Sequence, residues 1–359
     1  MSQTADTLPK VQWWKIALGV AFGVSISGYF IATTIKPESL RQINFNYHLL
    51  VGLLIAALTV VIRDFAFMYK VRLSTGEKLS WRSVLRIVIL WEFGSAITPG
   101  SVGGIAFAFF LMKREGISLG RGTAAVMLNT FLDNVAFVVV FSLLYFVLGK
   151  QMFVVSANCP DLAGHTVLQG VRSLVDKAWI GYLAFAGAAL FFGIALFVLP
   201  HTTKKFFHHV AQWRIAKYFR NGLIYLGDEI EITSHEYKQQ NLWFWARMVT
   251  ATFINWMARY ALANALLFAF SNVPLNMLQI FARQYVLWVF LVIPSTPGAS
   301  GLAEMGFMAM NCEFIPGGLA AAVALVWRLY NYYLYIALGS LLLPKWITDV
   351  VASGQNKNK

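Results

Sequence analysis

The chain has 359 residues, a formal net charge of +13 and an apolar content of 58%. Soluble domains are about 45–50% apolar, so this composition excludes an ordinary soluble protein and favours an integral membrane protein. The Lys and Arg residues stand mainly in short segments between apolar runs. That placement is typical of cytoplasmic loops beside anionic lipid and not of a nucleic-acid-binding surface.

Six apolar runs are long enough to cross about 30 Å of hydrocarbon as helices that rise 1.5 Å per residue. We therefore predict an all-α polytopic fold with about six transmembrane helices. The runs are roughly 13–35, 48–70, 120–149, 178–199, 242–270 and 317–343. The first is too long for the apolar core of a signal peptide, so we expect it to be retained.

Two further apolar regions, roughly 83–112 and 278–311, are each interrupted by Thr-Pro-Gly followed by another glycine. Pro removes a backbone donor and Gly permits a tight turn, and broken backbone at membrane depth survives only inside protein or beside a wet cavity. We predict two re-entrant helical hairpins in matching halves of the chain. The predicted tip residues are Thr98, Pro99, Gly100 and Gly103, then Thr296, Pro297, Gly298 and Gly301, each 198 positions later.

The distribution of Lys and Arg predicts the orientation. The basic segments are 70–86 (which begins with Lys70), 113–121 and 201–241, and the segments 36–47 and 150–177 carry fewer basic residues. We predict a multi-pass protein of the plasma membrane, as in a bacterial inner membrane, with both termini cytoplasmic. Because three predicted spans separate the hairpins, they enter from opposite faces and form an inverted repeat.

This topology divides the chain into five parts. They are an N-terminal span and external loop (1–47), a first repeat (48–149), an external loop with a connecting span and a basic cytoplasmic segment (150–241), a second repeat (242–343) and a cytoplasmic tail (344–359).

Charged residues inside the apolar regions are candidates for function, because charge at membrane depth is costly. We predict substrate binding by Arg63, Asp133, Arg259, Glu304 and Arg328. Guanidinium groups bind phosphate bidentately, and helix ends freed by the breaks add amide donors. The carboxylates would orient the Arg side chains or couple protons.

Structural explanations stay open for several of these residues. The Arg and acidic side chains could pair only to hold helices together. Arg63 and Asp64 could lie at the membrane interface, with Arg63 snorkelling. Glu92 and Glu304 could simply accept hydrogen bonds from freed amides, and Asn129 and Asp133 could join helices.

The remaining features carry weaker predictions. Segment 201–240 could be an interfacial amphipathic helix or a solvated connector. Its acidic stretch Asp228–Glu231 resembles a metal-binding patch but is more typical of a solvated face. Cys159 and Cys312 are both predicted on the external side, where a disulfide could form. The sequence contains no catalytic motif such as Gly-x-Ser-x-Gly or His-Glu-x-x-His, and we predict no metal and no cofactor.

Several motifs resemble the flippase-like family, that is, the lysylphosphatidylglycerol synthase transmembrane-region family, over about 48–343. They are the segment from Glu92 to Gly104 with its Thr-Pro-Gly-Ser-Val-Gly-Gly, then Lys-Arg-Glu-Gly-Ile-Ser at 113–118, Phe131-Leu132-Asp133, the segment from Pro294 to Glu304, and Trp327-Arg328-Leu329. The resemblance implies roles for both sets of tip residues and for Asp133, Glu304 and Arg328. The chain departs from the family pattern at Ala106, near a usual acidic residue, and at Thr130, near a usual Arg.

The resemblance implies a lipid flippase or lipid transporter that handles an anionic or aminoacylated lipid or a lipid-linked intermediate. The synthase's soluble domain does not follow the last span, so we expect no aminoacyl transfer and no enzymatic activity. The alternatives are a membrane enzyme acting on a polyprenyl or phospholipid substrate, with Asp228–Glu231 as its site, and a small-solute transporter. The expected partners are membrane lipids and no nucleic acid, with a homo-oligomer and a separate lipid-modifying enzyme left open.

Overall fold

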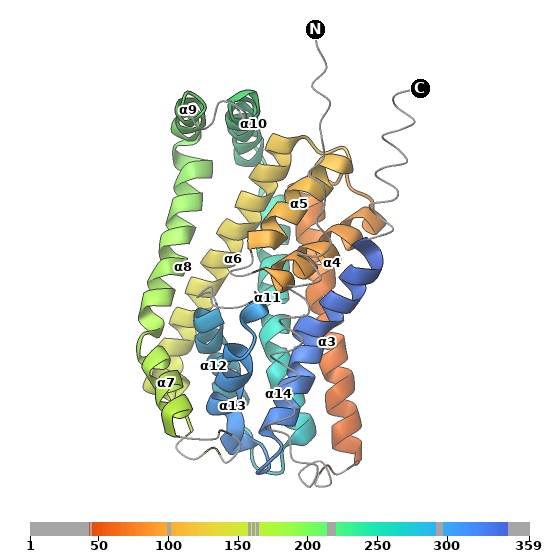
Figure 1. The fold of residues 1–359 in the computed structure, drawn as a ribbon. Coiled ribbons are helices and arrows are strands. Elements are labelled where there is room, and N and C mark those ends of the chain that lie inside the picture. The colour runs from red at the N-terminus through yellow and green to blue at the C-terminus, as the bar shows by residue number, and fades with distance from the viewer. Residues whose placement is uncertain are drawn as a thin grey trace.

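The computed structural model describes residues 43, 45–98, 102–156, 159, 162, 165–213, 220–291 and 297–343. Every regular element within these ranges is a helix (Figure 1). The longest helices are α3 (Tyr47–Ser74), α6 (Leu119–Leu148) and α11 (Leu242–Phe270), and they run lengthwise through the bundle together with α8 (Ala178–Gly193). The all-α prediction is confirmed for the described residues.

Three of the described helical stretches are long and apolar enough to cross a membrane: Tyr47–Ser74, Gly120–Phe153 and Ala178–Val198. Helix α11 also has 29 residues. Because its polar residues Asn255, Arg259 and Asn264 lower its mean hydropathy, α11 is not among the three stretches that are apolar enough to cross a membrane. The predicted run 317–343 is helical from Ala320, with a π-helical turn at Leu329–Tyr333. The predicted span 13–35 lies outside the described residues.

Local sequence explains where the long helices begin and how closely they pack. Asn46 and Asn241 each accept a hydrogen bond from an amide of the first turn, which caps α3 and α11. Gly52 lets these two helices approach closely, because a Cβ there would lie 2.5 Å from the Cβ of Ala269. Helices α3 and α11 are therefore closely packed against each other.

Two pairs of short helices flank the Thr-Pro-Gly breaks. Helices α4 (Trp81–Ile97) and α5 (Val102–Arg114) lie in the upper part of Figure 1, and α12 (Met277–Leu291) and α13 (Leu302–Asn311) lie in its lower part. Gly104 of α5 packs against α4, because a Cβ there would lie 2.0 Å from Oγ of Ser95. The predicted arms of both breaks are thus helices of nearly the expected bounds.

The second break is built from left-handed backbone. Gly298, Ala299 and Gly301 have φ of +58°, +51° and +88°. These values suit glycine and strain Ala299, since L-residues avoid positive φ. Pro297 starts this turn. The tip residues Pro99, Gly100 and Thr296 lie outside the described residues.

Helices α9 (Pro200–Val210) and α10 (Arg220–Lys238) lie across the upper end of the bundle and are seen nearly end-on in Figure 1. Lys204 joins them, with Nζ 3.0 Å from a carboxylate oxygen of both Asp228 and Glu231. Its hydrogen bonds lower the pKa of both carboxyls, and the same bonds raise the pKa of Lys204. His201 and His208 also pair with these carboxylates, so the acidic stretch holds two helices together.

The described residues include no group of three or more His, Cys, Asp or Glu side chains placed to hold a metal ion. Cys159 and Cys312 are both buried and are not joined to each other, so the disulfide left open by the sequence does not form. A short helix, α7 (His165–Asp176), lies at the lower end of the bundle and contacts α13.

Candidate functional site

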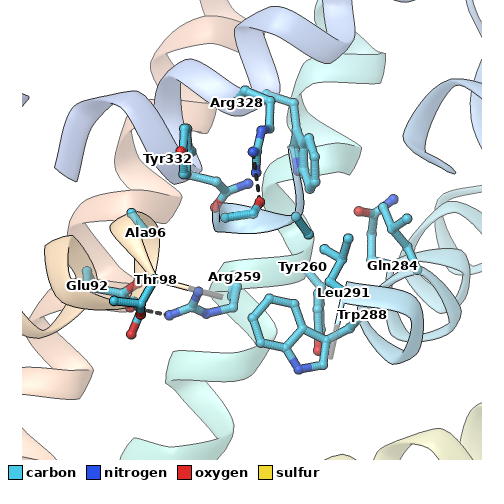
Figure 2. Close-up of a pocket in the computed structure, with 16 residues that line it drawn as sticks. Glu92, Ala96, Thr98, Arg259, Tyr260, Gln284, Trp288, Leu291, Arg328 and Tyr332 are labelled. Carbon is cyan, nitrogen blue, oxygen red and sulfur yellow. Dashed lines mark hydrogen bonds and ion pairs between the residues drawn. The ribbon is translucent and has the colours of Figure 1, made fainter. Parts of the chain in front are cut away.

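A cavity of about 120 Å³ lies where the end of α4, the middle of α11, α12 and the turn at Gly298 meet (Figure 2). Helix α14 (Ala320–Arg328) and the π-helical turn after it close its other side. Its lining residues are Glu92, Ser95, Ala96, Thr98, Arg259, Tyr260, Gln284, Leu287, Trp288, Leu291, Gly298, Ala299, Trp327, Arg328, Asn331 and Tyr332. We call this cavity A and treat it as the candidate ligand-binding site, because two guanidinium groups line it.

The first guanidinium group, that of Arg328, is held by the broken helix itself. Its Nε donates to Oε1 of Glu304 at 2.9 Å, and its Nη2 donates to the carbonyl of Gly298 at 2.9 Å. The other oxygen of Glu304 accepts the amide of Gly301 at 2.7 Å, which caps α13. Glu304 therefore both satisfies a freed amide and orients Arg328, which combines two roles that the sequence presented as alternatives.

The second guanidinium group is that of Arg259 on α11. It donates to Glu92 of α4 and lies 5.5 Å and 5.6 Å from the ring centroids of Trp256 and Trp288. Figure 2 shows the Arg259 side chain reaching towards Glu92 and Thr98. Glu92 thus pairs with an Arg 167 positions away and is more than an acceptor for freed amides.

A second cavity of about 420 Å³, cavity B, adjoins the first. Five residues line both cavities, namely Glu92, Ser95, Arg259, Trp288 and Leu291. Helix α6 contributes Thr130, Asp133 and Asn134 to cavity B, and α8 contributes an apolar wall that includes Phe185 and Phe192. The Arg259–Glu92 ion pair therefore stands in the wall between the two cavities.

Asp133 lines cavity B and pairs with Lys70 of α3. Nζ of Lys70 donates to Oδ1 of Asp133, and Nε1 of Trp256 donates to the same oxygen at 2.7 Å. The charge pattern places Lys70 in the basic segment 70–86, but α3 continues to Ser74 and the Lys70 side chain is 0% exposed. The burial of Lys70 could have been expected from the helical register, because the register of α3 continues past the end of its apolar run.

Arg63 lies outside both cavities. It is 1% exposed, pairs with Asp64 and donates to Oδ1 of Asn331 at 3.1 Å. Tyr335 donates to Asp64 in turn. The snorkelling interpretation of Arg63 is wrong because the guanidinium is buried between helices. Arg63 is linked to cavity A by its hydrogen bond to Asn331, which lines that cavity.

Polar atoms without partners gather around cavity A. Nε2 of Gln284, the hydroxyl of Tyr260 and Nε of Arg259 are buried and meet no hydrogen-bond partner within the described structure. Buried polar groups are nearly always satisfied, so such a cluster indicates a place for water or a ligand. Of the described tip residues, Thr98 and Gly298 line the cavity, and Gly103 lies in α5.

The comparisons with known proteins agree with this membrane architecture. A family model described as the lysylphosphatidylglycerol synthase TM region matches residues 15–339. A UPF0104 membrane protein of Archaeoglobus fulgidus is 21% identical over 74% of this chain and 76% of its own length. Another, of Methanocaldococcus jannaschii, is 25% identical over 75% of this chain and 76% of its own length. No solved structure matches significantly.

Proposed function

Because the chain belongs to the lysylphosphatidylglycerol synthase transmembrane-region family, we propose that this membrane-embedded protein transports a lipid between leaflets. The substrate is an anionic or aminoacylated phospholipid or a lipid-linked intermediate, and the site is cavity A. We propose that the chain is a transporter and not an enzyme, that membrane lipids are its direct partners, and that a lipid-modifying enzyme supplies the substrate.

The pair of guanidinium groups at cavity A carries this proposal. Arg259 and Arg328 come from different helices and both line the cavity. Together with the unpartnered amide of Gln284 and hydroxyl of Tyr260, they supply donors that suit a phosphate group. Guanidinium groups also stack on aromatic faces, and Cζ of Arg328 lies 4.1 Å from the ring centroid of Tyr332.

The volume of cavity A limits what enters it. A volume of 120 Å³ corresponds to about four water molecules at ~30 Å³ each. A phosphate-sized head group fits this space, whereas acyl chains do not. The head group would therefore pass through the protein while the acyl chains stay in the bilayer.

The proposed topology places both breaks inside the membrane. Helices α4, α5, α12 and α13 have 17, 13, 15 and 10 residues. At 1.5 Å per residue they span about 26, 20, 23 and 15 Å, which is less than the ~30 Å of hydrocarbon. We propose six spans and two re-entrant hairpins that enter from opposite faces, with both termini in the cytoplasm and the protein in the plasma membrane.

The two alternative functions, a membrane enzyme and a small-solute transporter, would use different sites. A membrane enzyme would use Asp228 and Glu231, but both carboxylates are engaged by Lys204. A small-solute transporter is favoured by one observation, the small volume of cavity A. The two transporter functions differ in whether the molecule that moves carries acyl chains.

The test is a reconstitution with a labelled lipid. Vesicles of phosphatidylcholine and phosphatidylglycerol carry fluorescent phosphatidylglycerol, and dithionite bleaches only the label in the outer leaflet. We expect the wild-type protein to expose inner-leaflet label and Arg328→Gln to lose at least tenfold in rate, since one charged hydrogen bond is worth about 1.5–3 kcal/mol.

A matched control is Glu313→Gln, which alters the ion pair between buried Arg283 and solvent-exposed Glu313 outside both cavities. It should keep the wild-type rate. Gel filtration and thermal unfolding confirm that each variant is folded. Unchanged movement of the label by folded Arg328→Gln protein contradicts the proposed site.

A further inference from the structure

We propose that Lys70 and Asp133 form a proton-binding site and that the protein carries one proton together with each anionic head group. This inference rests on the proposed transport function and adds the ion that drives it. The observation behind it is a buried Lys–Asp pair whose carboxylate opens onto cavity B, beside the Arg259–Glu92 pair.

The two members of the pair differ sharply in their surroundings. Lys70 is fully buried, whereas Asp133 is 25% exposed and lines cavity B. Both described donors, Nζ of Lys70 and Nε1 of Trp256, bind Oδ1. No donor from the described residues reaches Oδ2, which leaves this oxygen for a proton arriving through the cavity.

A purely structural ion pair would be better satisfied than this one. An ammonium group has three N–H donors, and the described hydrogen bonds of Lys70 go to one acceptor, Oδ1 of Asp133. By contrast, Arg328 donates to Glu304, to the carbonyl of Gly298 and to Ser300. Ionisable groups at membrane depth that face a cavity and pair with one another typically mark ion pathways and proton relays.

The charges around the two cavities explain why a proton would bind with an anion. The groups that face Asp133 are Lys70 on α3, Arg259 on α11 and Glu92 on α4, while α8 and α12 contribute uncharged residues to cavity B. Together with Asp133, these four groups carry no net charge. A proton on Asp133 gives them a net charge of +1, which favours one singly charged phosphodiester at Arg259.

The proton step is a simple association. Solvent in cavity B gives a proton to Oδ2 of Asp133, an O–H bond forms, and Lys70 keeps its three protons. The site gains one proton and one positive charge, and it releases the same proton when the cavity communicates with the other side. By linkage, a bound anionic head group raises the proton affinity of Asp133 as much as the proton raises the affinity for the head group.

An infrared titration tests the proton site without any transport. Purified wild-type protein is brought from alkaline to acid pH, and the carbonyl stretch of protonated carboxyl groups is followed. We expect a band that Asp133→Asn removes and that Glu313→Gln retains. In Lys70→Met the band should already be present at alkaline pH, because no ammonium balances a carboxylate there. A wild-type spectrum identical to that of Asp133→Asn overturns the proton site.

A transport measurement tests the coupling. In the vesicles described above, a pH difference of one unit is imposed with the membrane potential clamped. One-to-one symport predicts that the leaflet distribution of labelled phosphatidylglycerol changes by up to about tenfold, since one pH unit is a tenfold ratio of proton activity. In Lys70→Met the distribution should be the same with and without the gradient.

The outcomes separate the two proposals. If wild-type protein moves the label but ignores the gradient, the coupling is wrong and the transport function stands. If wild-type protein moves no label, the transport function fails and the coupling fails with it, while the infrared result still decides whether Asp133 binds a proton.

Discussion

The turn at Gly298 offers a sharp test of how the second break holds Arg328. Gly298 has φ of +58°, and a Cβ there would lie 2.0 Å from Cε2 of Tyr332. Placing a Cβ-bearing residue in left-handed backbone costs about 1–2 kcal/mol, and overpacking a filled site costs about 1–3 kcal/mol. We therefore expect Gly298→Ala to lower the free energy of unfolding by about 2–5 kcal/mol.

The neighbouring residue provides a matched control. Ala299 already has φ of +51°, so Ala299→Gly relieves the same strain. The stability gained by relieving this strain is partly offset, because glycine has more conformational freedom in the unfolded chain, which costs about 0.4–1 kcal/mol. We expect Ala299→Gly to leave stability unchanged or raise it by about 1 kcal/mol.

Reversible unfolding by dodecyl sulfate in mixed micelles, followed by tryptophan fluorescence, measures both variants. A change of less than about 1 kcal/mol for Gly298→Ala, the lower end of the strain cost alone, refutes the geometry of this turn.

Two further predictions concern other parts of the bundle. Lys204 lowers the pKa of Asp228 and Glu231 from their ordinary values of 3.8 and 4.5, so their stabilisation is present above those values and is lost as the pH falls further. Hydrogen exchange in α9 and α10, corrected for its intrinsic rate, should rise at such acid pH, and Lys204→Met should remove the acid step. Gly104→Val should destabilise the protein by about 1–3 kcal/mol, because the new side chain would collide with Ser95. The control is Gly187→Val, which should change stability little because no neighbouring atom lies within 4 Å of a Cβ there. Equal losses of stability at both glycines would contradict the close packing of α4 on α5.

The positions of the helices were largely predictable because their limits depend on local signals. The arm expected at 83–97 is α4 at Trp81–Ile97, and the run expected at 242–270 is α11 at Leu242–Phe270. Asn241 caps the latter, and the Thr-Pro-Gly break ends the former. Such signals act within a few residues, so a single sequence contains them in full.

The partners of the charged residues were not predictable in the same way. Glu92 and Arg259 are 167 positions apart and meet only because the fold brings α4 and the middle of α11 to the same cavity. The charge of Lys70 ends the apolar run and predicts a basic segment from residue 70, although the helix continues to Ser74. Hydropathy locates the end of an apolar run from local composition. Whether a charged side chain such as Lys70 is buried depends instead on a partner distant in the sequence, here Asp133.

The shared wall between the two cavities has a consequence for the kinetics of any anion that crosses it. Arg259 cannot release Glu92 into an empty site without leaving two uncompensated charges, which costs about 3–5 kcal/mol when one partner of a buried pair is lost. An anion that takes the place of Glu92 before the carboxylate has left avoids that intermediate. Passage is then an associative substitution at one guanidinium group, and neutral molecules of the same size would find no such route.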